Sequence, residues 1–380
     1  MTSSEVHMFR HLSHWQAEQR ILLPEQLLSE KHPSFPLFSY IYKLTQKHCQ
    51  EAPLRKNGEI SFIHPMNVVL NLIRVGVTDE ITFCVGFLHD LVEDQVDAYK
   101  ERNALAEDEA GKEQMEAYRQ EAFAQLEKEL SAHATPEQCK EIIEAVRLVT
   151  RRRSETYYTY IAGIFSCPER KLKEVALQAK LADRIHNVLC IAHFTEETRI
   201  HECFKNIFML NNVKKYLLDV HGKDFLSKKN NVERLFTQCC KATYDAFVTI
   251  CALAEGKGIQ SVVTMLQLAL MKFAFEMGGM WEVTQLNKNE THPLRLYQGV
   301  VRKYDLRLRN QREKFTVMKN DELNYCRKFF ADHHFTDEQL QAILDYKDAY
   351  GLKEAIGRLL YDAEYVVSGF LVNELVVEKE

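Results

Sequence analysis

The sequence lacks an apolar stretch long and uninterrupted enough to predict a membrane span. Its most apolar segment, residues 261–281, contains Gln267, Lys272 and Glu276, so we interpret it as a buried helix. The first residues are polar, and the apolar core that a signal peptide needs does not follow them. We therefore expect no membrane partner and a cytoplasmic location.

Patterns typical of disulfide frameworks and zinc ribbons are also missing. None of the 10 cysteines stands in a C-x-x-C pair, and a chain of 380 residues can bury a core without cross-links. We expect reduced thiols, which agrees with a cytoplasmic location.

The chain has no strong excess of charge of either sign. Its formal net charge is -5 at pH 7, which predicts no broad basic surface for DNA, RNA or an acidic membrane. Any site for an anionic ligand must therefore be formed locally by a few basic side chains.

Helical periodicity is present almost everywhere. Apolar residues recur at intervals of three and four, glycine and proline are scarce, and alternating strand-like runs are rare. Helix starts are recognisable at Asp79, at Thr135 with Gln138, and at Thr336 with Gln339. We predict an all-α fold.

Composition suggests three regions along the chain. We expect an N-terminal extension at residues 1–36, a first domain at 37–200 and a helical C-terminal region of unassigned role at 201–380. Within the first domain, residues 97–140 are rich in Glu, Lys, Ala and Gln, which favours an exposed helical insertion. The C-terminal helices could bind a protein partner or a second copy of the chain.

A cluster of one histidine and three carboxylates follows an apolar helix at FCVGFLHDLVED, residues 83–94. Ionised carboxylates are seldom buried without partners, because the loss of hydration is costly. The adjacent His89 and Asp90 offer one nitrogen and one oxygen ligand, a mixed set that suits Mn²⁺, Fe²⁺ or Zn²⁺. The alternative is a helix end whose polar residues face water.

A second candidate ligand, Asp183, lies in the segment KLKEVALQAKLADRIHNVLCI, residues 171–191. This segment is apolar on nearly all sides of its predicted helix, and a carboxylate in such a place needs a cation. A metal ion would serve, and a salt bridge with a nearby basic residue is the alternative.

The third piece is RKNGEISFIHP, residues 55–65. Pro65 suits the first position of a helix, so we expect His64 at the helix cap, where the positive end of the dipole would keep its imidazole neutral. A packed or solvent-facing histidine is the alternative.

Taken in order, His64, His89-Asp90 and Asp183 resemble the H…HD…D metal motif of the HD superfamily. Residues 48–191 further resemble the hydrolase domain of the RelA/SpoT alarmone hydrolases. Its motifs are matched by Arg55 and Gly58, by Phe62-Ile63-His64-Pro65, by Phe87-Leu88-His89-Asp90 with Glu93-Asp94, by Val149-Thr150, and by Lys180-Leu181-Ala182-Asp183-Arg184-Ile185-His186-Asn187. The resemblance implies an HD-type helical bundle that acts as a metal-dependent phosphohydrolase.

The resemblance also implies roles for individual residues. His64, His89, Asp90 and Asp183 would bind a divalent metal, which is Mn²⁺ in that family, with Fe²⁺ and Zn²⁺ as alternatives from the ligand chemistry. Glu93 and Asp94 would position or deprotonate the attacking water and protonate the leaving group, and the alternative is a role in orienting a ligand histidine.

The same resemblance assigns residues to the nucleotide substrate. Arg55 and Lys56 would contact the base and Asn187 the sugar. Within the run Arg151-Arg152-Arg153, Arg151 and Arg153 are candidates for clamping phosphates, because guanidinium groups match phosphate oxygens bidentately. Solvated loops are the alternative for all of these basic residues.

Two departures leave the substrate open. Cys190 stands where the family usually has threonine, and the stretch between Asp94 and Asp183 is longer than usual. We therefore weigh three hypotheses: a (p)ppGpp-like 3′-pyrophosphohydrolase, an HD phosphohydrolase of another nucleotide, and a helical regulatory or protein-binding module with a vestigial HD site. The C-terminal half shows no sign of the synthetase domain that bifunctional relatives carry.

Overall fold

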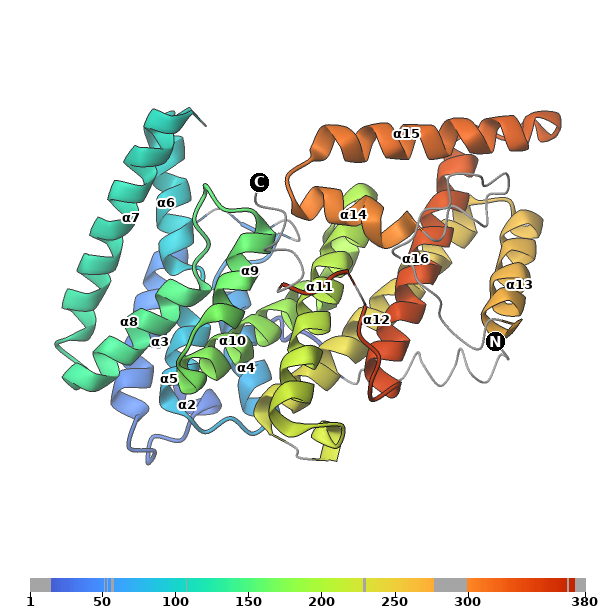
Figure 1. Ribbon diagram of the computed structural model, residues 1–380. Helices are drawn as coiled ribbons and strands as arrows, with labels where there is room; N and C mark the ends of the chain where they lie inside the picture. The colour runs from blue at the N-terminus through green and yellow to red at the C-terminus, as the bar shows by residue number, and fades with distance from the viewer. Residues whose placement is uncertain are drawn as a thin grey trace. The chain divides into compact units, whose positions relative to one another are not determined.

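The computed structural model describes residues 15–50, 52, 54–55, 58–106, 108–227, 230–276, 299–367 and 369–372. Helices and short connections make up this part of the chain, and it contains no strand (Figure 1). The predicted all-α fold is therefore confirmed. The helices form two compact units, one with residues 16–193 and 229–235 and the other with most of the chain from Phe194 onward.

The first unit contains the helices that hold the predicted site. They are α2 (Pro24–Leu27), α3 (Phe35–Gln50), α4 (Ile63–Arg74), α5 (Glu80–Leu88), α6 (Leu91–Arg102), α7 (Glu109–Leu130), α8 (Pro136–Val149), α9 (Tyr157–Ser166) and α10 (Arg170–Leu189), followed by the short 3-10 helix η1 (Ile191–His193).

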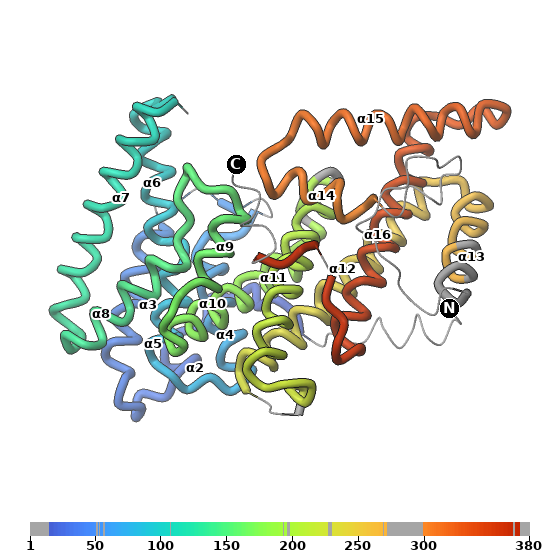
Figure 2. The backbone as a smooth tube through the Cα atoms, in the orientation of Figure 1, coloured from blue at the N-terminus to red at the C-terminus, as the bar shows by residue number. Residues whose placement is uncertain are grey.

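Helix α10 is the centre of this unit. It packs against α4, α5, α8 and α9, and the backbone trace shows it running among them (Figure 2). Its residues from Val175 to His186 are all buried, as the apolar sequence on nearly all its sides predicts. A polar side chain within this buried stretch is therefore packed against neighbouring helices.

Helix caps fix where the surrounding helices begin and end. The Asp79 carboxylate accepts a hydrogen bond from the Thr82 backbone N–H at the start of α5. Thr135 and Gln138 form a reciprocal capping box at the start of α8, as predicted. Gly76, just after α4, has a φ of +85°, a conformation that glycine adopts without strain.

Helices also fill residues 97–140, the segment expected to be an exposed insertion. It spans the end of α6, all of α7 and the start of α8, and α7 packs on both of the others. One face of α7 is buried through Met115, Phe123, Leu126 and Leu130, so this helix is part of the packed unit and not merely attached to it.

The second unit is a separate set of packed helices. It contains α11 (Glu196–His221), most of α12 (Asn231–Lys257), α13 (Gln260–Glu276), α14 (Val300–Leu308), α15 (Arg312–Phe329) and α16 (Asp337–Tyr361), with short 3-10 helices η2 (Phe225–Ser227) and η4 (Ala331–His333). Helix α16 packs against α11, α13, α14 and α15, and the predicted capping box of Thr336 and Gln339 opens it. None of the described helices is long and apolar enough to cross a membrane.

Candidate metal centre

Three helical segments bring the predicted ligands together. His64 lies in the first turn of α4, Asp183 lies in the buried part of α10, and His89 and Asp90 form the junction where α5 ends and α6 begins. Because α4, α5 and α10 pack on one another, residues far apart in the sequence converge here.

The position of His64 differs from the sequence-based prediction. Helix α4 begins at Ile63 with Phe62 as its N-cap, so His64 is the second helical residue and Pro65 the third. The first turn starts earlier because Phe62 is already in the right-handed helical conformation. His64 remains at the positive end of the helix, as its predicted role requires.

Donor atoms of the four residues face one another at short distances. The Nε2 atoms of His64 and His89 are 3.1 Å apart. Asp90 Oδ2 lies 3.0 Å from His89 Nε2 and 3.3 Å from His64 Nε2. Asp183 Oδ1 lies 3.3 Å from His64 Nε2 and 3.9 Å from His89 Nε2. Each of the two carboxylate oxygens therefore lies within 3.9 Å of both histidine nitrogens.

Burial is uneven around these donor atoms. His64, His89 and Asp183 are at most 4% exposed, whereas the side chain of Asp90 retains 40% of its accessible surface. The candidate site is thus closed to solvent on the side of His64, His89 and Asp183 and open on the side of Asp90. A centre of this kind can hold an ion and still admit a water molecule and a substrate.

Hydrogen bonds to the far sides of the imidazole rings favour free Nε2 atoms. His89 Nδ1 lies 2.9 Å from the carbonyl oxygen of Gly86, so this nitrogen carries the proton that it donates. His64 Nδ1 lies 2.8 Å from His186 Nδ1. Burial and the positive charges near it lower the pKa of His186 to about 2, so His186 is neutral and can accept a hydrogen bond from His64.

The contact of His64 with His186 continues to Cys190, and these three side chains form a hydrogen-bonded relay. The Sγ atom of Cys190 lies 3.6 Å from His186 Nε2. This contact is compatible with a proton on Nε2 that points to the sulfur, which leaves Nδ1 of His186 as the acceptor for His64. With both outer nitrogens protonated, His64 and His89 turn two lone pairs toward the same point. Two unprotonated Nε2 atoms 3.1 Å apart repel each other unless a cation lies beside them, so this donor set fits a divalent ion.

Without a metal, a proton can take this place. Burial lowers the pKa of His89, but the carboxylates of Asp90 and Asp183 outweigh it and raise the pKa overall. The local field therefore favours positive charge at this point, and a bound metal would compete with the proton.

Two side chains on α10 that sequence reasoning did not assign hold Asp183 and His64. Lys180 Nζ lies 2.6 Å from Asp183 Oδ2, and His186 contacts His64 as described above. Despite burial, Lys180 and the two ligand histidines hold the pKa of Asp183 well below its usual value. Lys180 and His186 lie three residues before and after Asp183, and this helical spacing was the sequence feature that could have predicted their contacts at the site.

Glu93 and Asp94 lie in the first turn of α6, beyond Asp90. Burial and the nearby charge of Asp90 raise the pKa of Glu93, while Arg151 and Lys180 oppose this rise. Burial, together with Asp90 and Glu93, raises the pKa of Asp94 to about 7. Although neighbouring groups crowd its carboxyl, Asp94 keeps part of its surface in contact with solvent, so it can exchange protons with water near neutral pH.

The predicted substrate residues fall into two groups. Arg55 donates from one guanidinium nitrogen to Asn187 Oδ1 at 3.4 Å, and Asn187 Nδ2 donates to Asp183 Oδ1 at 2.6 Å. Lys56 lies outside the described residues. Arg151 and Arg153 instead line a recess that also contains Glu93.

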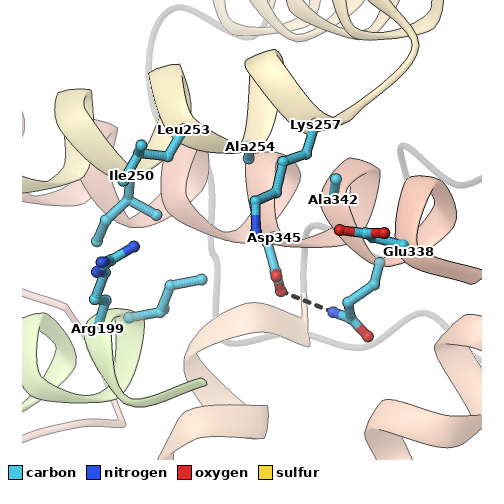
Figure 3. Close-up of a pocket in the computed structure, with 10 residues that line it drawn as sticks. Arg199, Ile250, Leu253, Ala254, Lys257, Glu338, Ala342 and Asp345 are labelled. Atoms are coloured by element: carbon cyan, nitrogen blue, oxygen red, sulfur yellow. Dashed lines mark hydrogen bonds between the residues drawn. The ribbon is translucent and has the colours of Figure 1, made fainter. Parts of the chain in front are cut away.

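A different cavity, of about 120 Å³, lies in the second unit. Figure 3 shows Arg199 of α11, Lys257 of α12 and Asp345 of α16 at this cavity, where Asp345 accepts a hydrogen bond of 2.7 Å from Gln341. Among the described residues, the group of His64, His89 and Asp90 is the one whose donor atoms suit a metal ion. The residues suited to metal-dependent chemistry therefore lie in the first unit.

The family model of the HD domain matches residues 61–188. This segment holds all four donor residues together with Glu93 and Asp94. The match supports a metal-dependent phosphohydrolase of the HD superfamily, and it covers less than half of the chain. No curated protein and no solved structure matches the chain.

Proposed function

We propose that the chain is an HD-type phosphohydrolase that acts on a nucleotide, and that its reaction is a (p)ppGpp-like 3′-pyrophosphohydrolysis. The observation that carries the proposal is the convergence of four ligand atoms from α4, α10 and the α5–α6 junction, with Nε2 of His64 and His89 3.1 Å apart. The motifs around His64 and Asp183 that resemble alarmone hydrolases support the choice of substrate.

His64, His89, Asp90 and Asp183 would hold the divalent metal, which we expect to be Mn²⁺, with Fe²⁺ and Zn²⁺ as alternatives. A metal bound there lowers the pKa of a bound water and neutralises charge that develops on phosphate oxygens. Lys180 and Asn187 contact the Asp183 carboxylate and restrict its rotation, so one oxygen stays directed toward the histidines.

Glu93 and Asp94 would handle protons. A group transfers protons most effectively when its pKa is near the working pH, and the pKa of Asp94 is about 7. We assign proton transfer between solvent, the attacking water and the leaving group to this pair. The exposure of Asp94 supports exchange with solvent after each turnover.

The two groups of basic side chains suggest how a nucleotide would lie. Arg55, with Lys56, would contact the base, because a planar guanidinium stacks on a purine. Asn187 would contact the sugar. Arg151 and Arg153 would contact phosphates on the side of Glu93. In this arrangement a phosphoester would lie between the two groups and next to the candidate ligands.

A second candidate function is hydrolysis of another nucleotide. Cys190 contacts His186 at 3.6 Å, where the alarmone hydrolases usually have threonine, and helix α7 adds side chains to the recess beside Glu93. Both features alter the surroundings of the site while the ligand set is kept. They favour a changed substrate over a lost activity.

The test is hydrolysis by the purified chain with Mn²⁺, Fe²⁺ or Zn²⁺. Pyrophosphate released from ppGpp would support the first candidate, and turnover of another nucleotide in a panel that includes NADPH and deoxynucleotides would support the second. Asp183→Asn should abolish activity, whereas Glu174→Gln, a charge removed from the half-exposed part of the same helix, should not. Absence of turnover with every metal and nucleotide would refute both.

A further inference from the structure

A basic recess lies beside the candidate metal centre. It has a volume of about 130 Å³ and is formed by α6, α7 and the loop that follows α8. Its charged lining residues are Lys112, Arg119, Arg151, Arg152, Arg153, Glu93 and Glu116. Five cationic side chains thus face two carboxylates, so the recess has an excess of positive charge.

Arg119 of α7 is the most buried of these cations. It is only 6% exposed, and its guanidinium lies 5.0 Å from the centre of the Phe123 ring. One terminal nitrogen donates to Glu116 Oε1 at 3.0 Å, but Nε has no hydrogen-bond partner among the described residues. A buried donor without a partner is costly, and a bound acceptor in the recess would remove that cost.

The neighbours of Arg119 add further positive charge. Burial and the nearby guanidinium groups of Arg152 and Arg147 lower the pKa of Arg119, although Glu116 opposes them. Lys112 is paired with Glu109, and Arg153 is paired with Asp97. Within the described part of the chain, no ion pair involves the side chains of Arg151 or Arg152. Arg151 and Arg152 therefore supply the positive charge of the recess that no ion pair among the described residues neutralises.

We propose that this recess binds a polyphosphate group, with Arg119 and Arg152 as binding residues. In the main version of the proposal, the group is the phosphate tail of the nucleotide, and this version rests on the proposed function. Glu93 links the recess to the metal centre, because it lines the recess and lies in the same helical turn as the candidate ligand Asp90. A phosphate chain could therefore extend from the metal centre into the recess.

Guanidinium groups suit this ligand for a geometric reason. Each can donate two parallel hydrogen bonds to phosphate oxygens. A cluster of several guanidinium groups therefore matches a chain of phosphates better than it matches a single small anion. The proposal also gives α7 a function: the helix that lengthens the chain between Asp94 and Asp183 would supply part of substrate recognition.

The first experiment measures binding of tripolyphosphate to the full chain by calorimetry, with EDTA present so that the metal centre does not contribute. We expect Arg119→Gln and Arg152→Gln each to raise the dissociation constant about tenfold, as the loss of a charge-assisted hydrogen bond implies. The matched control is Arg147→Gln. Arg147 also lies over Phe123 but does not line the recess, so we expect a change of less than about twofold.

Arg119 packs in the interior, so its replacement could unfold the chain. Arg152 is exposed and carries no such risk, and Arg119→Lys retains the charge in a smaller change. Unchanged affinity in both Arg152→Gln and a folded Arg119 variant would overturn the proposal. An equal loss in Arg147→Gln would also overturn it, because general attraction by the basic surface would then explain the binding.

A second experiment separates the source of the polyphosphate. If the recess holds the tail of the substrate, tripolyphosphate should inhibit nucleotide hydrolysis competitively, and Arg119→Lys should raise KM more than it lowers kcat. Inhibition that does not compete with substrate would refute the substrate version and assign the recess to a free polyphosphate. If no nucleotide is hydrolysed, the proposed function fails, while the binding result decides separately whether the recess is an anion site.

Discussion

The Nζ atom of Lys180 lies 2.6 Å from Oδ2 of Asp183, three residues later on the same buried helix. The two oxygens of Asp183 therefore have different partners: Oδ2 contacts this ammonium, whereas Oδ1 accepts a hydrogen bond from Asn187 and faces the two histidines. Lys180 is 8% exposed, so water cannot replace it. The sequence-based alternatives for Asp183, a metal or a salt bridge, are thus compatible with each other in the structure.

Removal of Lys180 should destabilise the metal-free protein. Lys180→Met leaves the Asp183 charge buried with no cationic side chain paired to Oδ2, and breaking a buried pair in this way typically costs about 3–5 kcal/mol. Saturating Mn²⁺ should recover part of this loss, because the ion supplies the missing positive charge. The measurement is denaturant unfolding of the metal-free and metal-loaded protein.

The matched control for that experiment is Lys171→Met. Lys171 pairs with Glu141 at the surface of the same helix, with a side chain that is 58% exposed, so its loss should cost less than about 1 kcal/mol. An equal effect of the two substitutions would contradict the buried pair.

Loss of His186 should weaken metal binding without unfolding the chain. His186 accepts the hydrogen bond that leaves Nε2 of His64 free, and partners of this kind typically contribute roughly 10–100-fold to metal affinity. We expect His186→Leu to raise the metal dissociation constant by that factor, measured by competition with a chelating dye. The control is His133→Leu, an exposed histidine of the same unit. If His186→Leu binds metal normally, the relay through Cys190 and His186 is not what orients His64.

Asp345 should make the protein less stable as pH rises. Burial and the neighbouring Asp348 raise the pKa of Asp345 to about 6, above the value of about 3.9 for an unfolded aspartate. Between these values the unfolded chain has lost a proton that the folded chain still holds, so stability falls as pH rises, and the loss is complete above about pH 6.

The substitution Asp345→Asn removes this pH-dependent loss. We expect it to raise the melting temperature more at pH 8 than at pH 4.5, because the penalty is largely absent at the lower pH. Glu338→Gln is the control, since Glu338 lines the same cavity but is exposed. An equal gain from Asp345→Asn at both pH values would show that the carboxyl is not perturbed.

The sequence was sufficient for the features that depend on local chemistry. The capping residues Thr135 and Thr336 define helix starts from four consecutive positions, and the apolar sides of α10 predict its burial. The candidate ligands could be proposed because unpaired buried carboxylates are costly and because the motifs resemble those of a known family. These inferences need no knowledge of the partners that pack against each residue.

Side chains whose role depends on distant neighbours were missed. His186 contacts His64, which is 122 positions away in the sequence. Arg119 becomes a candidate binding residue only because the loop at residues 151–153 lines the same recess. The position of His64 within α4 was also off by two residues, because Pro65 was taken as the first helical residue. The backbone of Phe62, which no side-chain pattern reveals, decides where that helix begins.

The second unit contains a buried charge cluster that offers a test independent of the metal centre. Lys303 Nζ lies 2.5 Å from Glu322 Oε2 and also contacts Asp348, and Lys347 lies 3.4 Å from the other oxygen of Glu322. All four side chains are at most 4% exposed. Two positive and two negative charges balance, so the loss of one leaves the others without compensation.

Lys303→Met should therefore lower the free energy of unfolding by about 3–5 kcal/mol, measured by denaturant titration. Lys314→Met, which removes an exposed lysine from α15, should have little effect. The double variant Lys303→Met with Asp348→Leu should recover most of the loss, because apolar residues of similar volume can replace a buried ion pair at little net cost. If the double variant is no more stable than the single one, the loss comes from packing around Lys303 and not from an uncompensated charge on Asp348.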